Sequence, residues 1–448
     1  AVGNDSRISG PALKEAFMKG VTDSGYDVLD CGLASTPAMF MTTIDPGLKV
    51  EGGVMLTASH LPFNRNGMKF FTEKGGFDKE NISELLQIAE EGKFLESKVS
   101  GNVQSFDFIS DYAAFLVETI RLGVNDPQQF ERPLQGLKII VDAGNGAGGF
   151  FADQVLAPLG ANVQGSQFLD PDGHFPNHIP NPEDREAMMS ICDAVVREKA
   201  DLGIIFDTDV DRAAIVDAHG KAINRNDLIA LISSIILQEH PGSVIVTDSI
   251  TSAGLKQFIE SDLKGIHHRY KRGYKNVINE SQRLNAAGKD SWLAIETSGH
   301  AALRENQFLD DGAYLVAKLL IQMARMNQQG TTLVSLIENL KRPVEEKEFR
   351  LRITTPEFSD YGNMVLKELS SRIADVSEWI PEKPNYEGIR VQCKGECEDG
   401  WFLLRMSLHD PVMPLNVESN LQGGVMMIVK RLKHLLEEFK NLDNSPLY

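Results

Sequence analysis

Cysteine and long apolar runs are both scarce in this chain of 448 residues. Its four cysteines are Cys31, Cys192, Cys393 and Cys397, and no two of them form a C-x-x-C pair. At this density we expect reduced thiols, although Cys393 and Cys397 leave a disulfide or half a metal site open. The longest apolar run, 228–237, is interrupted by two serines and is too short to cross a membrane. We therefore expect a buried helix there and no membrane partner.

Basic charge is also in deficit. The chain has 45 lysines and arginines against 63 aspartates and glutamates, which gives a net charge of −18. Such a surface disfavours nonspecific binding to nucleic acid. No signal-peptide pattern is visible, so we expect a cytoplasmic protein, with an organelle such as a plastid as the alternative.

The chain is too long for one typical core, so several domains are expected. Short apolar strands alternate with helical patterns over most of the length, and the last hundred residues change to alternating strands and a terminal amphipathic helix. We predict an α/β protein with three similar mixed α/β domains, at 1–133, 134–240 and 241–344. A smaller α+β domain follows at 345–448, and the four surround a central cleft.

The segment Thr57-Ala58-Ser59-His60 offers a hydroxyl nucleophile in a predicted loop between two strands. A serine hydroxyl reacts poorly without a base, a metal or a very electrophilic target. His60 and Lys69 are candidates for proton handling and positive charge. The alternative is a plain surface turn in which Ser59 serves as a cap.

Three aspartates, Asp207, Asp209 and Asp211, follow the apolar run 202–206. Ligands usually bind at this end of a strand in α/β proteins. The three carboxylates repel one another unless a cation neutralises them, and Mg²⁺ prefers such hard oxygen ligands. Arg212 adds a forked donor suited to a phosphoryl group. A solvated acidic turn is the alternative.

The glycine-rich stretch 144–149 matches the dinucleotide-binding pattern and lies between a predicted strand and a predicted helix. Asp170 stands near the distance at which that pattern places its acidic residue. Nothing else in the chain indicates hydride chemistry. We therefore favour a tight strand-to-helix turn and keep a nicotinamide dehydrogenase as an alternative function.

Two further polar segments follow predicted strands. Glu296 and Ser298 suit vicinal sugar hydroxyls, and His300 suits proton transfer or a phosphate contact. Arg405 and Ser407 suit a phosphate dianion. Each segment taken alone could also be an ordinary turn.

Together these segments resemble the α-D-phosphohexomutase superfamily, which includes phosphomannomutases, phosphoglucomutases and phosphoglucosamine mutases. The resemblance extends over nearly the whole chain. It implies an isomerase that interconverts hexose 1-phosphate and hexose 6-phosphate through a phosphoserine and a bisphosphorylated sugar. It also implies Mg²⁺, and glucose 1,6-bisphosphate or an equivalent as activator. The expected partner is a small-molecule hexose phosphate, and the expected assembly is a monomer or dimer.

The resemblance also assigns roles to individual residues. Those implied as catalytic are Ser59, His60, Lys69, Arg212 and His300. Those implied to bind substrate are Arg7, Gly273, Lys275, Glu296, Ser298, His300, Arg405 and Ser407. Those implied to bind the metal are Ser59, Asp207, Asp209 and Asp211.

The sequence departs from the superfamily pattern at several positions. Thr208 stands where glycine is usual, and Leu408 and His409 replace a small residue and a threonine in the phosphate-binding loop. We expect these last two changes to alter phosphate affinity or substrate choice. The stretch at 1–7 resembles an internal family segment, so we expect that a preceding strand is missing from the first sheet. A non-catalytic homologue that binds sugar phosphate as a sensor or regulatory partner is the alternative function.

Overall fold

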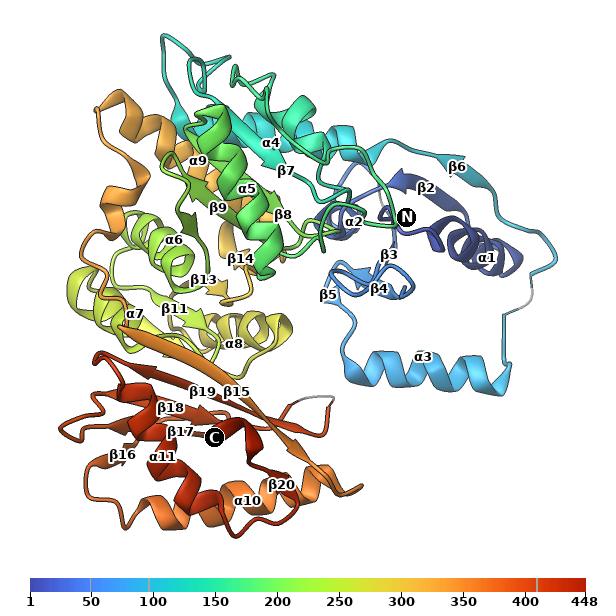
Figure 1. The fold of residues 1–448 in the computed structure, drawn as a ribbon. Helices are drawn as coiled ribbons and strands as arrows, with labels where there is room; N and C mark the ends of the chain where they lie inside the picture. Colours follow the sequence, from blue (N-terminus) through green and yellow to red (C-terminus); the bar gives the residue numbers. More distant parts are fainter. Residues whose placement is uncertain (49, 96, 408–409) are drawn as a thin grey trace. The chain divides into compact units, whose positions relative to one another are not determined.

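The computed structural model describes residues 1–48, 50–95, 97–407 and 410–448 (Figure 1). These residues form two compact units. Unit 1 contains 1–235 and 298–336, and unit 2 contains 236–297 and 337–448. All four cysteines are free thiols, which confirms the expectation of no disulfide. Among the described residues, no helix combines the length and apolar character that a membrane span needs.

The first sheet of unit 1 has six strands in the order β5-β4-β3-β1-β2-β6. Its elements are β1 (Val2–Asn4), α1 (Gly10–Asp23), β2 (Val28–Leu33), α2 (Thr36–Met41), β3 (Gly53–Leu56), β4 (Met68–Thr72), β5 (Gly75–Gly76), α3 (Lys79–Glu91) and β6 (Val103–Ser105). Strand β1 runs parallel to β2 and β3, whereas β3 and β4 are antiparallel. The predicted nucleophile loop therefore connects two neighbouring strands of one sheet.

The second sheet of unit 1 has the order β10-β9-β8-β7. Its elements are β7 (Ile139–Asp142), a π-helix (Phe151–Leu156), α5 (Arg185–Glu198), β8 (Leu202–Phe206), β9 (Ala213–Asp217), β10 (Ala222–Ile223) and α6 (Arg225–Glu239), the last of which continues into unit 2. Strand β8 is buried along its whole length between β7 and β9. The apolar run at 202–206 is confirmed as a central strand.

The glycine-rich stretch after β7 is a tight turn, as predicted. Gly144 and Asn145 both adopt positive φ angles, of 53° and 60°. A Cβ atom on Gly146 would lie 2.6 Å from the carbonyl oxygen of Thr208. The close approach that requires glycine here is therefore to the acidic segment of the same unit.

The later part of unit 1 adds β14 (Ala301–Leu303) and α9 (Gly312–Gln328), and α9 packs against α4 (Phe108–Val124). Asp311 caps α9 by accepting the backbone N–H of Tyr314 at 2.8 Å. The same oxygen accepts the hydroxyl of Tyr112, which is fully buried on α4, at 2.6 Å. Burial raises the pKa of Asp311 to about 6. Two residues 199 positions apart in sequence, one on α4 and the other at the start of α9, thus meet at one buried hydrogen bond.

Unit 2 begins with a sheet in which β11 lies between β12 and β13, all parallel. Its elements are β11 (Val244–Thr247), α7 (Ala253–Gln257), a π-helix (Phe258–Asp262), β12 (Ile266–Arg269), α8 (Tyr274–Ala286) and β13 (Ser291–Ile295). Strand β12 borders β11 on the side away from β13.

The final sheet of unit 2 has six strands in the order β16-β17-β18-β19-β15-β20. Its elements are β15 (Glu345–Ile353), α10 (Phe358–Ile373), β16 (Trp379–Pro381), β17 (Ile389–Cys393), β18 (Gly400–Leu404), β19 (Val412–Ser419), α11 (Gly424–Leu436) and β20 (Leu442–Asp443). Side chains alternate between the two faces, as a period of two requires. One face packs with α10 and α11 into a single apolar core. The α/β fold followed by a smaller α+β region is as predicted.

The opposite face of this sheet carries Arg390, Trp401 and Leu403. Leu403 and Trp401 pack with Ile250, which follows β11. The guanidinium of Arg390 lies 3.5 Å from the centre of the Trp401 ring and donates to the carbonyl oxygens of Ser249 and Thr251 at 2.8 and 3.0 Å. The two sheets of unit 2 are therefore joined through a buried arginine.

Replacing Tyr112 with Phe should lower the stability of unit 1 by about 1–3 kcal/mol, because Asp311 keeps its buried carboxylate but loses a hydrogen-bond donor. Thermal unfolding followed by circular dichroism measures the change. Tyr26→Phe is the control, since Tyr26 is 56% exposed and should leave the transition in place. Equal behaviour of the two variants would show that the helix contact contributes nothing through this bond.

Candidate functional site

The Ser59 loop runs from the end of β3 to the start of β4. Ser59 has a φ angle of 49°, in the left-handed region that few non-glycine residues adopt. Its hydroxyl donates to an oxygen of Asp207 at 2.9 Å and accepts from Nη2 of Arg212 at 2.8 Å. The strained backbone thus presents the hydroxyl to the acidic segment of the second sheet.

Arg7 stabilises this loop through hydrogen bonds to its backbone. Its side chain is buried, and its guanidinium donates to the carbonyl oxygens of Ser59, Leu61, Pro62 and Arg65. Asp5 accepts from Nε of Arg7 at 3.2 Å and from the hydroxyl of Thr57 at 2.7 Å. Burial raises the pKa of Asp5 to about 6. The guanidinium is occupied with the loop backbone, and substrate binding by Arg7 stays a prediction.

The acidic segment lies between β8 and β9, and all three of its aspartates are buried. Ligand atoms from Asp207, Asp209 and Asp211 lie within 4.8 Å of one another. Val210, between two of them, has a φ angle of 67°, which is unfavourable for a β-branched residue. The loop therefore adopts a strained backbone that gathers three carboxylates.

Lys69, from β4, partly neutralises this cluster. Its ammonium lies 2.7 Å from Oδ2 of Asp209 and 2.5 Å from Oδ2 of Asp211, and Thr36 also donates to Asp209. Burial acts to raise the pKa of Asp211, but Lys69 and other nearby positive groups outweigh it and hold the pKa below its usual value. Burial, reinforced by Asp211, raises the pKa of Asp207.

The remaining oxygens of the cluster meet the requirement of a cation site. Oδ1 of Asp209 and Oδ1 of Asp211 are buried, and neither has a hydrogen-bond partner among the described residues. A buried carboxylate oxygen without a partner is costly. Together with Asp207 they form a donor set of hard oxygens, which fits Mg²⁺.

Arg212 connects the acidic segment with the Ser59 loop. Its side chain is 2% exposed, and Nε and Nη2 donate to Asp207 at 3.1 and 3.0 Å. Nη2 also donates to Nδ1 of His60 at 2.6 Å, and Nη1 donates to Asn181 at 3.2 Å. Burial, followed by the charge of Arg212, lowers the pKa of His60 to about 4. His60 is therefore neutral at pH 7, with Nδ1 as an acceptor.

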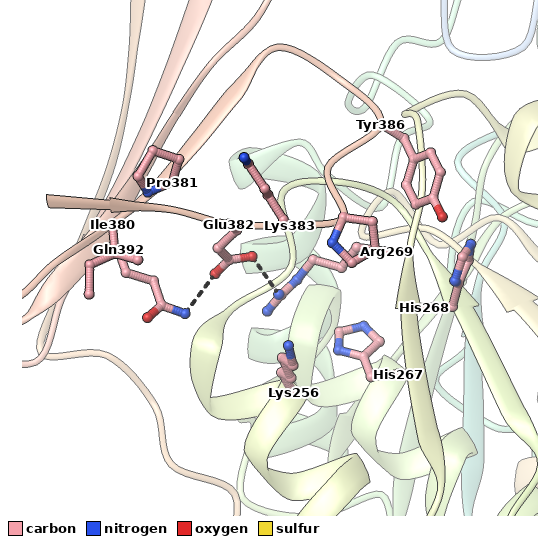
Figure 2. Close-up of a pocket in the computed structure, with 11 residues that line it drawn as sticks. Lys256, His267, His268, Arg269, Ile380, Pro381, Glu382, Lys383, Tyr386 and Gln392 are labelled. Atoms are coloured by element: carbon pink, nitrogen blue, oxygen red, sulfur yellow. Dashed lines mark hydrogen bonds and ion pairs between the residues drawn. The ribbon is translucent and has the colours of Figure 1, made fainter. Parts of the chain in front are cut away.

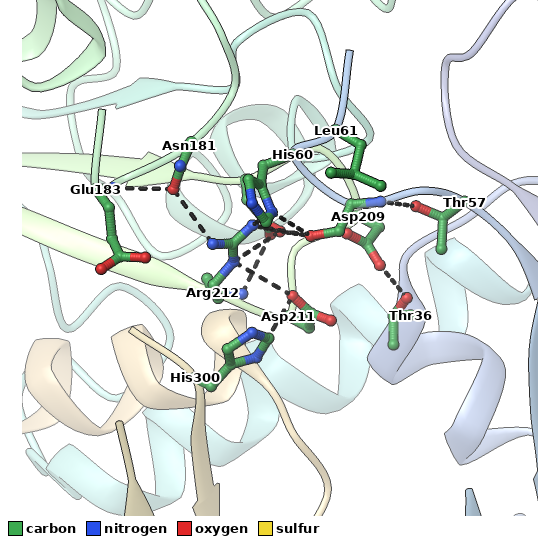
Figure 3. Close-up of polar contacts among 12 residues, drawn as sticks. Thr36, Thr57, His60, Leu61, Asn181, Glu183, Asp209, Asp211, Arg212 and His300 are labelled. Atoms are coloured by element: carbon green, nitrogen blue, oxygen red, sulfur yellow. Dashed lines mark hydrogen bonds and ion pairs between the residues drawn. The ribbon is translucent and has the colours of Figure 1, made fainter. Parts of the chain in front are cut away.

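His300 has the opposite character. Its Nδ1 lies 2.7 Å from Oδ2 of Asp310. The same nitrogen lies 3.7 Å from Oδ1 of Asp211, and Figure 3 shows these two side chains. Burial acts to lower the pKa of His300, but the charges of Asp310 and Asp211 outweigh it and raise the pKa to about 9. The site thus holds one neutral and one charged imidazole at pH 7.

The segment 296–300 is divided between the units, with Glu296 in unit 2 and Ser298 and His300 in unit 1. In unit 2, Glu296 accepts the backbone N–H of Gly273 at 2.5 Å. In unit 1, Arg212 and His300 form an antiparallel bridge. A Cβ on Gly299 would lie 2.7 Å from the carbonyl oxygen of Ala213, so glycine is required for this contact.

The segment that begins at Arg405 follows β18 in unit 2. Arg405 is buried, burial lowers its pKa, and its Nε has no hydrogen-bond partner among the described residues. Its Nη1 lies 3.8 Å from Oε1 of Glu387. The hydroxyl of Ser407 accepts the N–H of Asp410 at 3.3 Å. Leu408 and His409 lie outside the described residues, so the predicted effect of these two departures stays a prediction.

Unit 2 also contains Lys275, in the first turn of α8, and this helix begins directly after the positive-φ residue Gly273. Gly273, Lys275, Glu296, Arg405 and Ser407 therefore belong to unit 2. Unit 1 contains Arg7, Ser59, His60, Lys69, Asp207, Asp209, Asp211, Arg212, Ser298 and His300.

The sequence analysis missed several partners of these groups: Thr36, Asn181, Asp310 and Glu387. Asp310 stands ten residues beyond His300, and Asn181 stands 31 before Arg212. Neither spacing follows a known ligand pattern, so no local signal distinguishes them from ordinary polar residues. Only the fold brings them to the site.

Comparison with known proteins agrees with this arrangement. Three family models match in order: phosphoglucomutase/phosphomannomutase α/β/α domain I at residues 1–96, domain II at 112–220 and domain III at 224–342. These matches extend over most of the chain.

Individual relatives match nearly end to end. A phosphoglucomutase of Neisseria meningitidis is 32% identical over 99% of this chain and 89% of its own length. A phosphomannomutase/phosphoglucomutase of Pseudomonas putida is 30% identical over 96% of this chain and 85% of its own length. The solved structure of a phosphoglucomutase/phosphomannomutase family protein of Burkholderia thailandensis superposes with a TM-score of 0.80 at 26% identity, covering 98% of this chain and 89% of that one.

None of these findings favours the non-catalytic homologue or the dehydrogenase. The names of the relatives describe enzymes that act on hexose phosphates. In this chain, which has the same fold, a buried acidic cluster lies beside a serine hydroxyl. The chain belongs to the phosphoglucomutase/phosphomannomutase family of the α-D-phosphohexomutase superfamily, and it is an isomerase that shifts the phosphoryl group of a hexose phosphate.

Proposed function

We propose that this isomerase interconverts hexose 1-phosphate and hexose 6-phosphate through a phosphoserine at Ser59 and a bisphosphorylated sugar. The observation that carries the proposal is the position of the Ser59 hydroxyl, within hydrogen-bond distance of both Asp207 and Arg212. A phosphoryl group on this oxygen would lie beside a guanidinium, which suits phosphate oxygens.

In the transfer step, a sugar hydroxyl oxygen forms a new bond to phosphorus and the bond between phosphorus and Ser59 Oγ breaks. The hydroxyl loses its proton to a base, and the leaving serine oxygen keeps the electron pair and receives a proton. The reverse transfer, from the other phosphorylated oxygen of the sugar, restores the phosphoserine. Lys69 or His300 is proposed as the general acid and base: the charged form supplies a proton to the leaving serine oxygen, and only the neutral form can receive the proton of the sugar hydroxyl.

The proposed metal ligands are Ser59, Asp207, Asp209 and Asp211. Bound Mg²⁺ would offset the charge that a phosphoserine adds beside three carboxylates. The buried oxygens of Asp209 and Asp211 that lack a hydrogen-bond partner among the described residues support this assignment. Glucose 1,6-bisphosphate or an equivalent is the proposed activator, because it can donate a phosphoryl group to an unphosphorylated Ser59.

Substrate binding is proposed for polar residues that follow strands β13 and β18 and for the start of α8. Glu296 and Ser298 would hold sugar hydroxyls, and Arg405, Ser407, Lys275 and the backbone of Gly273 would hold the phosphate that is not reacting. For Arg7, its bonds to four loop carbonyls support an indirect contribution, through the position of Ser59.

The domain boundaries at 1–133, 134–240, 241–344 and 345–448 are part of the same proposal. The small-molecule partner is a hexose phosphate. Assembly as a monomer or dimer and location in the cytoplasm or an organelle stay predictions.

Ser59→Ala should abolish turnover without unfolding the protein, because the loop is held by Arg7 through its backbone. Intact mass before and after incubation with glucose 1,6-bisphosphate and Mg²⁺ should show a gain of one phosphoryl group in the wild type and none in the variant. Ser97→Ala, in an exposed loop, is the control and should behave as wild type. Phosphorylation or turnover retained in Ser59→Ala would exclude this serine as the phosphoryl carrier.

Asp209→Asn should weaken the apparent affinity for Mg²⁺ about 10- to 100-fold, since it removes a charged ligand from the cluster. The measurement is the rise in unfolding temperature with Mg²⁺ concentration, alongside activity after treatment with a chelator. Asp201→Asn is the control, because Asp201 is an exposed aspartate of the same domain. Unchanged Mg²⁺ stabilisation in Asp209→Asn would place the metal elsewhere.

Arg405→Ala should weaken binding of hexose phosphate about 10- to 100-fold, because a charge-assisted hydrogen bond contributes about 1.5–3 kcal/mol. Equilibrium binding with a Ser59→Ala background separates this effect from chemistry. Arg350→Ala, at an exposed position of β15, is the control. Loss of folding without a selective loss of phosphate binding would make Arg405 a structural residue.

A further inference from the structure

Unit 2 contains a pocket of about 370 Å³ (Figure 2). One of its lining residues, Glu382, pairs with the buried Arg390 that joins the two sheets of this unit. One wall comes from α7 and β12, and the other from β16, β17 and the segment between them. The described lining residues are Lys256, His267, His268, Arg269, Ile380, Pro381, Glu382, Lys383, Pro384, Tyr386 and Gln392. None of these residues belongs to the catalytic or substrate-binding set described above.

Two lining residues of the pocket, Arg269 and Glu382, belong to a network of hydrogen bonds and ion pairs. Arg269 donates to Thr251 at 3.0 Å and to the carbonyl oxygen of Ser252 at 2.7 Å, and its Nη1 lies 3.3 Å from Glu382. Glu382 also pairs with Arg390 at 3.1 Å. Glu382 is thus shared between two guanidinium groups, and their positive charges offset its negative charge.

Two lysines of the lining remain available to a ligand. The side-chain ammonium groups of Lys256, from α7, and Lys383, from the β16–β17 segment, have no hydrogen bond or ion pair with a described residue. Three permanently basic residues and one carboxylate among the described lining give a net charge of +2, in a protein whose net charge is −18. Concentrating positive charge in this way attracts a dianion.

The pocket also offers groups for an uncharged part of a ligand. His267 is buried, and its Nε2 bonds to the hydroxyl of Thr247 at 2.8 Å, while Nδ1 has no partner among the described residues. A buried ring nitrogen of this kind can bind a ligand hydroxyl or N–H. Tyr386 adds a ring that lies 5.3 Å from His268, centre to centre, and two prolines add apolar surface.

We propose that this pocket binds a phosphomonoester carried on a sugar ring and that the ligand acts as an effector separate from the substrate. The phosphate would lie between Lys256 and Lys383, and a ring hydroxyl would reach His267. The volume is within the range of small-molecule sites. Sugar phosphates and nucleoside monophosphates share this chemistry.

The segment that lines the pocket also reaches the phosphate residue Arg405. Lys383 and Tyr386 face the pocket, while the next residue, Glu387, lies 3.8 Å from Arg405 and accepts from the hydroxyl of Ser249 and the N–H of Arg272. A ligand that fixes residues 383–386 would therefore bias the position of Glu387. This coupling rests on the proposed role of Arg405, whereas binding in the pocket does not.

The experiment is calorimetric titration of the full chain with AMP, glucose 6-phosphate and inorganic phosphate. The variant is the double charge reversal Lys256→Glu/Lys383→Glu, and the control is Lys367→Glu/Lys394→Glu, which changes the same charge at exposed positions. We expect saturable binding of at least one phosphomonoester, weakened at least about 10-fold by the pocket variant and not by the control. Arg405→Ala distinguishes pocket binding from substrate binding, because it should remove only the latter.

The outcomes separate the possibilities. Pocket-dependent binding of AMP alone identifies a nucleotide effector, and that of glucose 6-phosphate alone identifies a sugar phosphate; binding of both supports the shared chemistry. Pocket-dependent binding of inorganic phosphate alone, or no binding that the pocket variant weakens, would overturn the proposal. Mutase turnover of the pocket variant without effector should equal that of the control, so a failure of the proposed reaction is detected independently.

Hydrogen exchange tests the coupling. The bound phosphomonoester should slow amide exchange in residues 383–388 of the wild type and not in the pocket variant. It should also change the KM for hexose phosphate, through Arg405, in the wild type alone. Binding without either change would retain the site and remove its regulatory role.

Discussion

The structure of unit 1 depends on the repulsion among three buried carboxylates. The side chains of Asp207, Asp209 and Asp211 lie so close together that their negative charges would destabilise the loop without positive groups beside it. Arg212 and Lys69 supply two of these charges, from the same loop and from the first sheet. The electrostatic requirement of the acidic segment thus joins two sheets that have separate cores, and two buried carboxylate oxygens of the segment have no hydrogen-bond partner among the described residues.

The same field decides the state of the two histidines. His60 lies against Arg212 and is held neutral, whereas His300 lies between Asp310 and Asp211 and is held charged. Two histidines of one site are therefore held in opposite states, His60 as a hydrogen-bond acceptor from Arg212 and His300 as a hydrogen-bond donor to Asp310. In unit 2, carboxylates likewise lie beside guanidinium groups. Glu382 pairs with two arginines, and Glu387 lies 3.8 Å from Arg405.

Sequence patterns predicted much of this protein because its signals are local. The run 202–206 is apolar at every position, and it is a fully buried central strand. The glycines at 144–149 predicted a tight turn, although the backbone that requires Gly146 to be small, that of Thr208, is 62 residues away and gives no sign in the turn itself. The segments around Ser59, Asp207, Glu296 and Arg405 indicated the family because their side chains carry the chemistry directly.

The sequence by itself determined the order of strands and helices, the acidic, hydroxyl and basic groups available for chemistry, and the superfamily. The tertiary structure alone decided which of these groups meet. Asp310 became the partner of His300, Arg7 the support of the Ser59 loop, and Glu387 the neighbour of Arg405. Charge and burial act through space, so a pKa or an ion pair depends on neighbours that chain folding brings together from distant positions.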